Sequence, residues 1–354
     1  MKRFFPFLYG VLLLAFTTYA ALDTFVITRV YQTVSASETD TAREETAAVT
    51  EANESSEDAS SGATVSQDQA GSESSSRKKG RHRSDSSSQV HSNTPSGTET
   101  TTEETTESSA AVSTQTSYQD ENITVNLTEY RVEDTTVYVA DVTLSSAEYL
   151  QTAFAQNAYG RNVTAKVSDM AESAGAILAI NGDYYGARQS GYVIRDGVLY
   201  RDTAAKNQED LVIYADGHFE IINESEITAQ ELIDAGAQTV LSFGPGLVID
   251  GEISVTADEE VGKAMASNPR TAIGIIDDLH YVFVVSDGRT GESEGLSLQQ
   301  LAVFMQSLGC TQAYNLDGGG SSTMVFRGSL INNPTTSGSS TKERSVSDIV
   351  YIGY

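Results

Sequence analysis

Residues 35–117 set the first limit on the fold, because they contain almost no large apolar side chains and are rich in Ser, Thr, Glu and Ala. A segment of this composition buries too little apolar surface to offset the entropy lost on folding, and we expect a disordered linker. A flexible coil of that length reaches roughly 50 Å. The folded part of the 354-residue chain is therefore expected to be one domain over residues 118–354, long enough for a sizeable core.

Lys2 and Arg3 stand before an uncharged, largely apolar run over residues 4–22. A run of this length is typical of a single membrane span, and the two cations predict that the N-terminus stays in the cytoplasm. We therefore predict a signal anchor within residues 1–34, with the C-terminal domain outside the cell membrane. The alternative is a secretory signal peptide that is cleaved near Ala20.

The net charge of -27 argues against a nucleic-acid partner, since phosphate backbones are bound by clustered Lys and Arg. The acidic composition suits solubility and could attract divalent cations. The single cysteine, Cys310, excludes an intramolecular disulfide, and its place between a predicted helix and strand indicates a buried thiol. The sequence does not indicate an oligomeric state.

Apolar periodicity in the domain predicts an α+β fold, with a single mixed, largely antiparallel twisted sheet and two or three packed helices. Asp-Gly pairs at 196–197, 216–217 and 250–251 are typical of tight hairpin turns. Capping boxes and apolar spacing mark the helices. Three predicted helices begin at Ser145, Thr228 and Ser297. A further predicted helix spans residues 164–173.

Polar clusters stand at the ends of four predicted strands and combine acids, amides, arginines and glycines. The last cluster places Asp317 before three glycines, which suit positive φ or close approach to a ligand and can form an anion-binding nest. Arg270 follows a rigid Asn-Pro turn and suits a bidentate grip on phosphate or carboxylate. Taken singly, each cluster also fits a simple turn, a flexible loop or a surface ion pair. The clusters are Asn181-Gly182-Asp183-Tyr184-Tyr185, Asn268-Pro269-Arg270-Thr271, Asp287-Gly288-Arg289 and Asn315-Leu316-Asp317-Gly318-Gly319-Gly320-Ser321-Ser322.

Taken together and in this order, the four clusters resemble the phosphodiester glycosidase family over about residues 176–351. The resemblance implies hydrolysis of a sugar 1-phosphodiester at the glycosidic C1–O bond, which leaves a phosphate monoester on the acceptor. The candidates for nucleophile or general base at an oxocarbenium-like transition state are Asp183, Asp287 and Asp317. The candidates for binding sugar or phosphate are Asn181, Arg270, Arg289, Asn315, Gly318, Gly319, Gly320, Ser321 and Ser322.

The segments before the domain bear on its substrate. The apolar run, the linker and the absence of paired cysteines differ from the animal members of the family and are typical of a Gram-positive surface protein. A wall, capsular or teichoic sugar-phosphate polymer is therefore the expected target. The sequence requires no cofactor, although a divalent cation could bind at the acid cluster. Two alternatives stay open: a non-catalytic module that binds phosphorylated surface glycan, and a metal-dependent phosphodiesterase that cuts the P–O bond.

Overall fold

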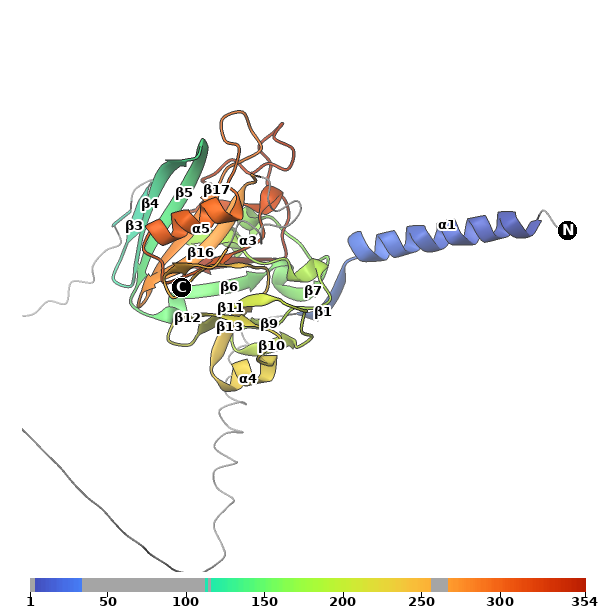
Figure 1. Ribbon diagram of the computed structural model, residues 1–354, viewed down its shortest axis with the longest axis horizontal. Helices are drawn as coiled ribbons and strands as arrows, with labels where there is room; N and C mark the ends of the chain where they lie inside the picture. The colour runs from blue at the N-terminus through green and yellow to red at the C-terminus, as the bar shows by residue number, and fades with distance from the viewer. Residues whose placement is uncertain (1–3, 34–111, 114–115, 256–266) are drawn as a thin grey trace, which may run out of the picture. The chain divides into compact units, whose positions relative to one another are not determined.

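The computed structural model describes residues 4–33, 112–113, 116–255 and 267–354 of the chain (Figure 1). The predicted linker lies almost entirely outside the described residues, so its disorder stays a prediction. The apolar run near the N-terminus forms the helix α1, Phe4–Phe25. Among the described residues, no helix is both long enough and apolar enough to cross a membrane.

Antiparallel pairing builds the domain, and every pairing between described strands runs antiparallel. The α+β class with largely antiparallel strands is therefore confirmed. The strands nevertheless form several sheets and not the single sheet that was expected. Hairpin turns determine which neighbouring strands pair, but they do not determine how distant hairpins are joined.

The nine-stranded sheet, in the order β15-β14-β18-β16-β17-β5-β4-β3-β2, is formed by Glu252–Ile253, Gly246–Ile249, Gln312–Asn315, Arg270–Asp277, His280–Ser286, Thr135–Leu144, Ile123–Val132, Ser117–Gln119 and Val112–Ser113. One five-stranded sheet, β20-β19-β8-β21-β6, is formed by Ser329–Leu330, Met324–Phe326, Leu178–Asn181, Asp348–Ile352 and Leu150–Phe154. The other, β10-β9-β13-β11-β12, is formed by Val198–Arg201, Val193–Arg195, Ala237–Leu241, Glu209–Tyr214 and Phe219–Asn223. A two-stranded sheet is formed by β1, Arg29–Thr33, and β7, Ala158–Arg161.

Local sequence explains where two of the helices begin. α4, Ala229–Asp234, and α5, Leu298–Ser307, start at the predicted capping boxes, with Thr228 and Ser297 as the N-cap residues. In each box the N-cap side chain accepts a hydrogen bond from the backbone N–H of the third helical residue. The side chain of that third residue accepts one from the backbone N–H of the N-cap residue. Two otherwise unpaired donors are thereby satisfied. These two predictions are therefore confirmed.

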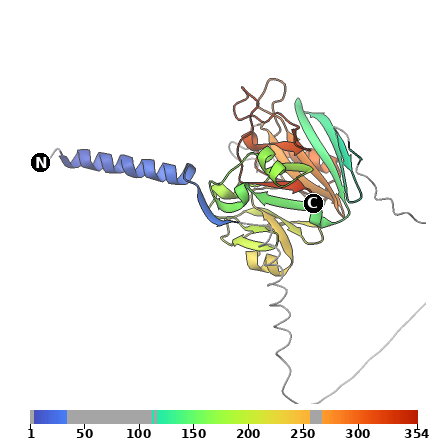
Figure 2. The same cartoon turned by 180° about the vertical axis from the view of Figure 1, so that it is seen from behind.

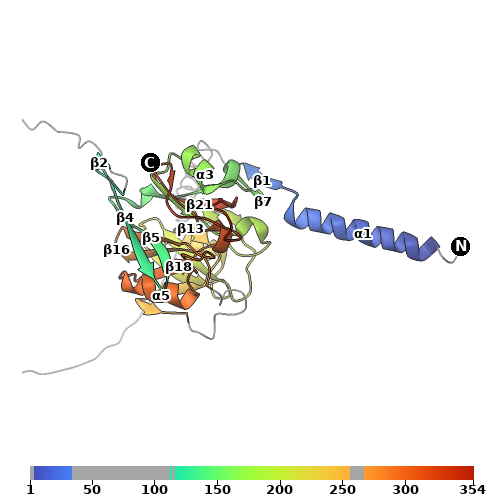
Figure 3. The same cartoon turned by 90° about the horizontal axis from the view of Figure 1, so that it is seen from above.

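α3, Val167–Ser173, falls inside the range 164–173 that was predicted as a helix. Gly175 follows it at a φ of 64°, a left-handed conformation that ends helices. Figure 2 shows α3 beside β21, and Figure 3 shows α3 and α5 on opposite sides of the domain. The two helices therefore cover different sheets, α3 that of β8 and β21, and α5 that of β14 and β18.

The prediction of a helix that begins at Ser145 is wrong. A single 3-10 turn, η1, Ala147–Tyr149, forms there, and its N-cap is Ser146. The residues that follow form β6, which pairs along its whole length with β21. Short isolated helices are marginal in water, so a capping signal cannot outweigh a strand pairing that buries apolar side chains.

Residues ahead of 118 also contribute an ordered strand, because β1 follows α1 closely and pairs with β7. The pairing is close at Gly160, where an added Cβ would lie 2.2 Å from the carbonyl oxygen of Arg29. The ring of Tyr31 packs on that of Tyr159 with centroids 5.8 Å apart. Both ends of the segment 34–111 are therefore connected to strands of the fold.

The largest cluster of buried apolar side chains lies among the nine-stranded and the two five-stranded sheets, with Val142, Leu178, Leu211 and Phe283 as members. A second cluster lies under α5 and includes Leu301. Because the strands are fixed by these two clusters, the polar residues at their ends are held on a packed support.

Candidate functional site

Antiparallel pairing brings the predicted clusters to the same edge of the nine-stranded sheet. The end of β18 lies beside the start of β16, since Asn315 pairs with Ala272, and the start of β16 pairs with the end of β17, Arg270 with Ser286. The cluster at the end of β8 reaches this edge through Asp317, whose N–H donates to the carbonyl of Gly182 at 3.3 Å. The structure therefore brings together the ends of four strands, of which only β16 and β17 are neighbours in the sequence.

Asn181 ties two of these ends to each other. Its Nδ2 donates to the carbonyl of Asp317 at 2.6 Å, and its Oδ1 accepts from the hydroxyl of Thr271 at 2.8 Å and from the N–H of Thr323 at 3.1 Å. The side chain is fully buried. Asn181 was predicted to bind substrate, and the structure places it where it holds the strand ends in register.

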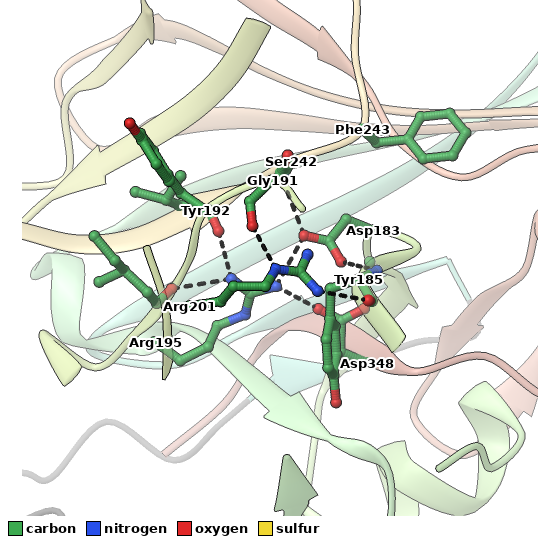
Figure 4. A network of polar contacts seen from close by, with 12 residues as sticks. Asp183, Tyr185, Gly191, Tyr192, Arg195, Arg201, Ser242, Phe243 and Asp348 are labelled. Carbon is green, nitrogen blue, oxygen red and sulfur yellow. Dashed lines mark hydrogen bonds and ion pairs between the residues drawn. The ribbon is translucent and has the colours of Figure 1, made fainter. Parts of the chain in front are cut away.

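Asp183 belongs to a buried ion network with Arg195 and Asp348, which Figure 4 shows from close by. Nη2 of Arg195 lies 3.1 Å from Oδ2 of Asp183 and 2.7 Å from Oδ2 of Asp348. The other contacts of Asp183 are the N–H groups of Tyr185, at 2.8 Å, and Ser242, at 3.0 Å. Both oxygens of Asp183 are therefore occupied by protein donors.

Asp348 is at the start of β21, directly beside the end of β8. A Cβ at Gly182 would lie 2.5 Å from Oδ1 of Asp348, so the close approach requires glycine at that position. Burial, with the nearby charge of Asp183, raises the pKa of Asp348 to about 8 despite the opposing effect of Arg195. One cation facing two buried carboxylates leaves an excess negative charge, and a proton on Asp348 removes it.

Asp317 differs from Asp183 in being only partly buried. Burial raises the pKa of its carboxyl, while the hydroxyl of Ser321 and the charge of Arg344 oppose that shift. The carboxyl thus lies beside a hydroxyl and a cation at the meeting point of the strand ends. Among the three candidate catalytic acids, Asp317 combines partial exposure with a perturbed pKa. This combination is typical of reacting groups.

The glycine turn after Asp317 forms a 3-10 turn, η5, Gly319–Ser321. Gly319 adopts a φ of 63°, and a Cβ there would lie 2.8 Å from Nη2 of Arg289. The N–H groups of Gly319, Ser321 and Ser322 donate to the carbonyls of residues 269, 318 and 319 at 2.8, 3.2 and 3.3 Å. Two amides of the predicted anion-binding nest, those of Gly319 and Ser321, are therefore used within the protein.

The predicted arginines lie on either side of this turn. Nε of Arg270 donates to the carbonyl of Leu296 at 2.8 Å, and the residue is buried. Arg289 is exposed, and it donates to Oδ1 of Asn268 at 3.0 Å and to the carbonyl of Thr336 at 2.8 Å. Both arginines have protein partners that hold the loops around Asp317.

Asp287 and Asn315 also make contacts that hold loops. The two oxygens of Asp287 accept from the backbone N–H and from Nδ2 of Asn333, at 2.8 and 2.9 Å. Nδ2 of Asn315 donates to the carbonyl of Gly244 at 2.7 Å. Ser321 and Ser322 are buried. The assignment of catalytic and binding roles among all these residues stays a prediction.

Three charged residues of the site were missed in the sequence: Arg195, Arg344 and Asp348. For Arg195 and Asp348 a signal existed, since each is a charged residue within or at the end of an apolar strand run, where only a paired ion is tolerated. Nothing in the local sequence near Arg344 indicated a role.

The described residues contain no group of three or more His, Cys, Asp and Glu side chains that is placed to hold a metal ion. Cys310 is buried, as expected, and burial raises the pKa of its thiol to about 12. A protonated thiol at neutral pH is a poor nucleophile and a poor metal ligand.

Known proteins resemble this chain in sequence and in fold. The sequence model of the phosphodiester glycosidase family matches residues 174–353. The SPbeta prophage-derived uncharacterized protein YomE of Bacillus subtilis (strain 168) is 33% identical over 203 residues, which are 55% of this chain and 31% of that protein. The N-acetylglucosamine-1-phosphodiester alpha-N-acetylglucosaminidase of Mus musculus is 30% identical over 188 residues, 48% of this chain and 36% of that protein. The chain thus spans about a third of the length of these relatives.

A solved structure shares the fold. The zebrafish N-acetylglucosamine-1-phosphodiester alpha-N-acetylglucosaminidase catalytic domain, auto-inhibited by its pro-peptide, aligns with a TM-score of 0.53 and 21% identity. The alignment covers 66% of this chain and 83% of that one.

Proposed function

The chain belongs to the phosphodiester glycosidase family, a family of hydrolases, and we propose that it hydrolyses the glycosidic C1–O bond of a sugar 1-phosphodiester. The products are the free sugar and a phosphate monoester. Water adds to C1, the bridging oxygen stays with phosphorus together with the bonding electron pair, and one proton of the water is released. Because a phosphate leaves readily, a strong general acid is not needed.

The placement of Asp317 carries the proposal. Its carboxyl is partly buried at the meeting point of the strand ends, with the hydroxyl of Ser321 and the charge of Arg344 nearby. A carboxylate in that setting can stabilise or attack an oxocarbenium-like carbon, or take the proton of an attacking water. We assign Asp317 to the reacting centre, as the nucleophile or as the general base.

Asp183 and Asp287 are assigned as positioning residues. Protein donors occupy both oxygens of each carboxylate, so an attack on a sugar would first require these hydrogen bonds to break. Their contacts instead hold the end of β8 and the loop that includes Asn333 around Asp317.

The substrate and location are proposed from the sequence. The two cations ahead of the apolar run that forms α1 support export through, and anchoring in, the cell membrane. A surface or wall glycopolymer with sugar 1-phosphodiester bonds is then within reach of the domain. Fractionation of the native host would test this, since recovery of the full chain in the cytosolic fraction would contradict it.

The activity is tested by incubating the purified full chain with a synthetic alkyl phosphodiester of N-acetylglucosamine 1-phosphate in ¹⁸O-labelled water. We expect free sugar, an alkyl phosphate and label in the sugar. Label in the phosphate would show P–O cleavage by a phosphodiesterase. Binding without turnover, with or without added divalent cation, would show a non-catalytic glycan-binding module.

The role of Asp317 is tested on the same substrate with Asp317→Asn. We expect at least a hundredfold loss of kcat with unchanged thermal unfolding, because the isosteric amide keeps the shape but not the charge. Near-normal turnover would remove Asp317 from the reacting centre. Retention of the anomeric configuration in the wild-type product would indicate a nucleophile, and inversion a general base.

A further inference from the structure

The loop over residues 331–347 lies against the glycine turn. Nη1 of Arg289 donates to the carbonyl of Thr336 at 2.8 Å, and a Cβ at Gly320 would lie 2.5 Å from Oγ1 of Thr336. The loop is also fixed at both ends, by Asn333 on Asp287 and by the pairing of residue 346 with residue 165. It therefore forms an ordered wall beside Asp317.

This wall contains a cavity of about 420 Å³ that is rich in cations and hydroxyls. The lining residues include Thr336, Ser337, Ser340, Lys342, Arg344 and Ser345. Glu343 lines it as well, but its two carboxylate oxygens accept from the N–H and the hydroxyl of Ser168, at 3.0 and 2.6 Å. The acid is thus held by α3.

Lys342 and Arg344 differ from the other basic residues of the site in their lack of protein partners. In the part of the chain that the structure describes, neither side chain forms a hydrogen bond or an ion pair, and the charge of Arg344 acts on Asp317. These two cations line the same cavity in a chain with a net charge of -27. Such a pair favours an anion as the occupant.

Other groups at the site are less able to bind an anion. Three amides of the glycine turn donate to protein carbonyls, Nε of Arg270 donates to Leu296, and Arg289 donates to Asn268 and Thr336. A substrate phosphate would have to displace these contacts, whereas at Lys342 and Arg344 it would replace water alone. The desolvation cost is therefore lower in the cavity.

We propose that Lys342 and Arg344, with the hydroxyls that line the same cavity, form the phosphate subsite and hold the leaving phosphate next to Asp317. This rests on the proposed function and adds to it the residues that bind the anion. On cleavage of the C1–O bond the phosphodiester monoanion becomes a monoester with a charge near -2 at neutral pH. The two cations stabilise that added charge as it develops in the transition state.

Phosphate binding by the full chain tests the subsite without any need for turnover. Titration with inorganic phosphate and with methyl phosphate, followed by ³¹P NMR or calorimetry, is made for the wild type, Lys342→Met and Arg344→Met. We expect each substitution to weaken binding by about tenfold or more, since each removes a charge-assisted contact. The control is Lys206→Met, an exposed lysine outside the loop, which should bind phosphate as the wild type does.

The pH dependence of kcat gives a second test. If Arg344 were only structural, its substitution would leave this pH dependence unchanged. Loss of its charge raises the pKa of Asp317, so the acidic limb of the kcat profile should move to higher pH in Arg344→Met and return toward the wild-type position in Arg344→Lys. Unchanged phosphate affinity in both methionine variants, or no saturable phosphate binding by the wild type, would overturn the subsite. If turnover is absent while phosphate binding still depends on both cations, the proposed function fails and the anion site stands.

Discussion

Replacement of Arg195 by methionine should strongly destabilise the fold. Arg195 lies 3.1 Å from Asp183 and 2.7 Å from Asp348, and all three side chains are at most 3% exposed. Methionine fills much of the same volume but leaves two buried carboxyl groups without their cation. Breaking a buried ion pair from one side costs about 3–5 kcal/mol. That is a large fraction of the roughly 5–15 kcal/mol that stabilises a typical domain.

The loss should depend on pH. Asp348 already has a pKa raised to about 8 in the folded protein, and removal of Arg195 raises it further, because burial and the charge of Asp183 then act without an opposing cation. An acid with a raised folded pKa keeps its proton in the native state and releases it on unfolding above about pH 4. Native proteins that bind more protons than unfolded ones lose stability as pH rises. Above about pH 8 the folded wild type releases the proton of Asp348 and the folded variant keeps it, so the loss of stability in Arg195→Met should be larger at pH 9.5 than at pH 6.

Urea unfolding of the wild type and the variant at these two pH values measures the effect. The double variant Arg195→Met/Asp348→Asn should recover part of the loss and show a weaker pH dependence, because one carboxyl is then neutral. Arg131→Met, at a site where the arginine side chain is 53% exposed, is the control and should change stability by less than about 0.5 kcal/mol. A loss below about 1 kcal/mol for Arg195→Met at both pH values would refute the reasoning.

Three further outcomes are expected. Gly319→Ala should cost about 1 kcal/mol from the positive φ and should lower kcat/KM, because the added Cβ displaces Arg289; unchanged kinetics would contradict the contact. Ser297→Ala should lower the unfolding free energy by about 1 kcal/mol through loss of the α5 capping box, measured by urea unfolding; a change near zero would mean that the cap does not contribute. Proteolysis at a site engineered within residues 34–111 should leave the N-terminal fragment bound to the domain through β1, measured by co-purification; separation in native buffer would contradict that pairing.

Several features of the fold were predictable because their causes are local. The capping boxes at Thr228 and Ser297 involve contacts three residues apart, and α4 and α5 begin where these boxes predict. The Asp-Gly hairpins follow for the same reason, since Asp196 and Gly197 themselves adopt the positive φ values of the turn. The failure at Ser145 has a distant cause, because β6 is selected by its pairing with β21 about 200 residues further along the chain.

The sequence alone determined the acids, amides and glycines at the strand ends, because runs of apolar residues that stop at such groups can be recognised without a partner. It also determined the family, through the order of four clusters. Only the tertiary structure decided which of these carboxyl groups is enclosed by protein partners and which is partly exposed. Asp183 is enclosed by Arg195 and Asp348, whereas Asp317 feels the charge of Arg344, and these interactions join strands and loops that no local pattern connects. Burial and charge pairing depend on those long-range contacts, so the chemistry of each acid was settled by packing.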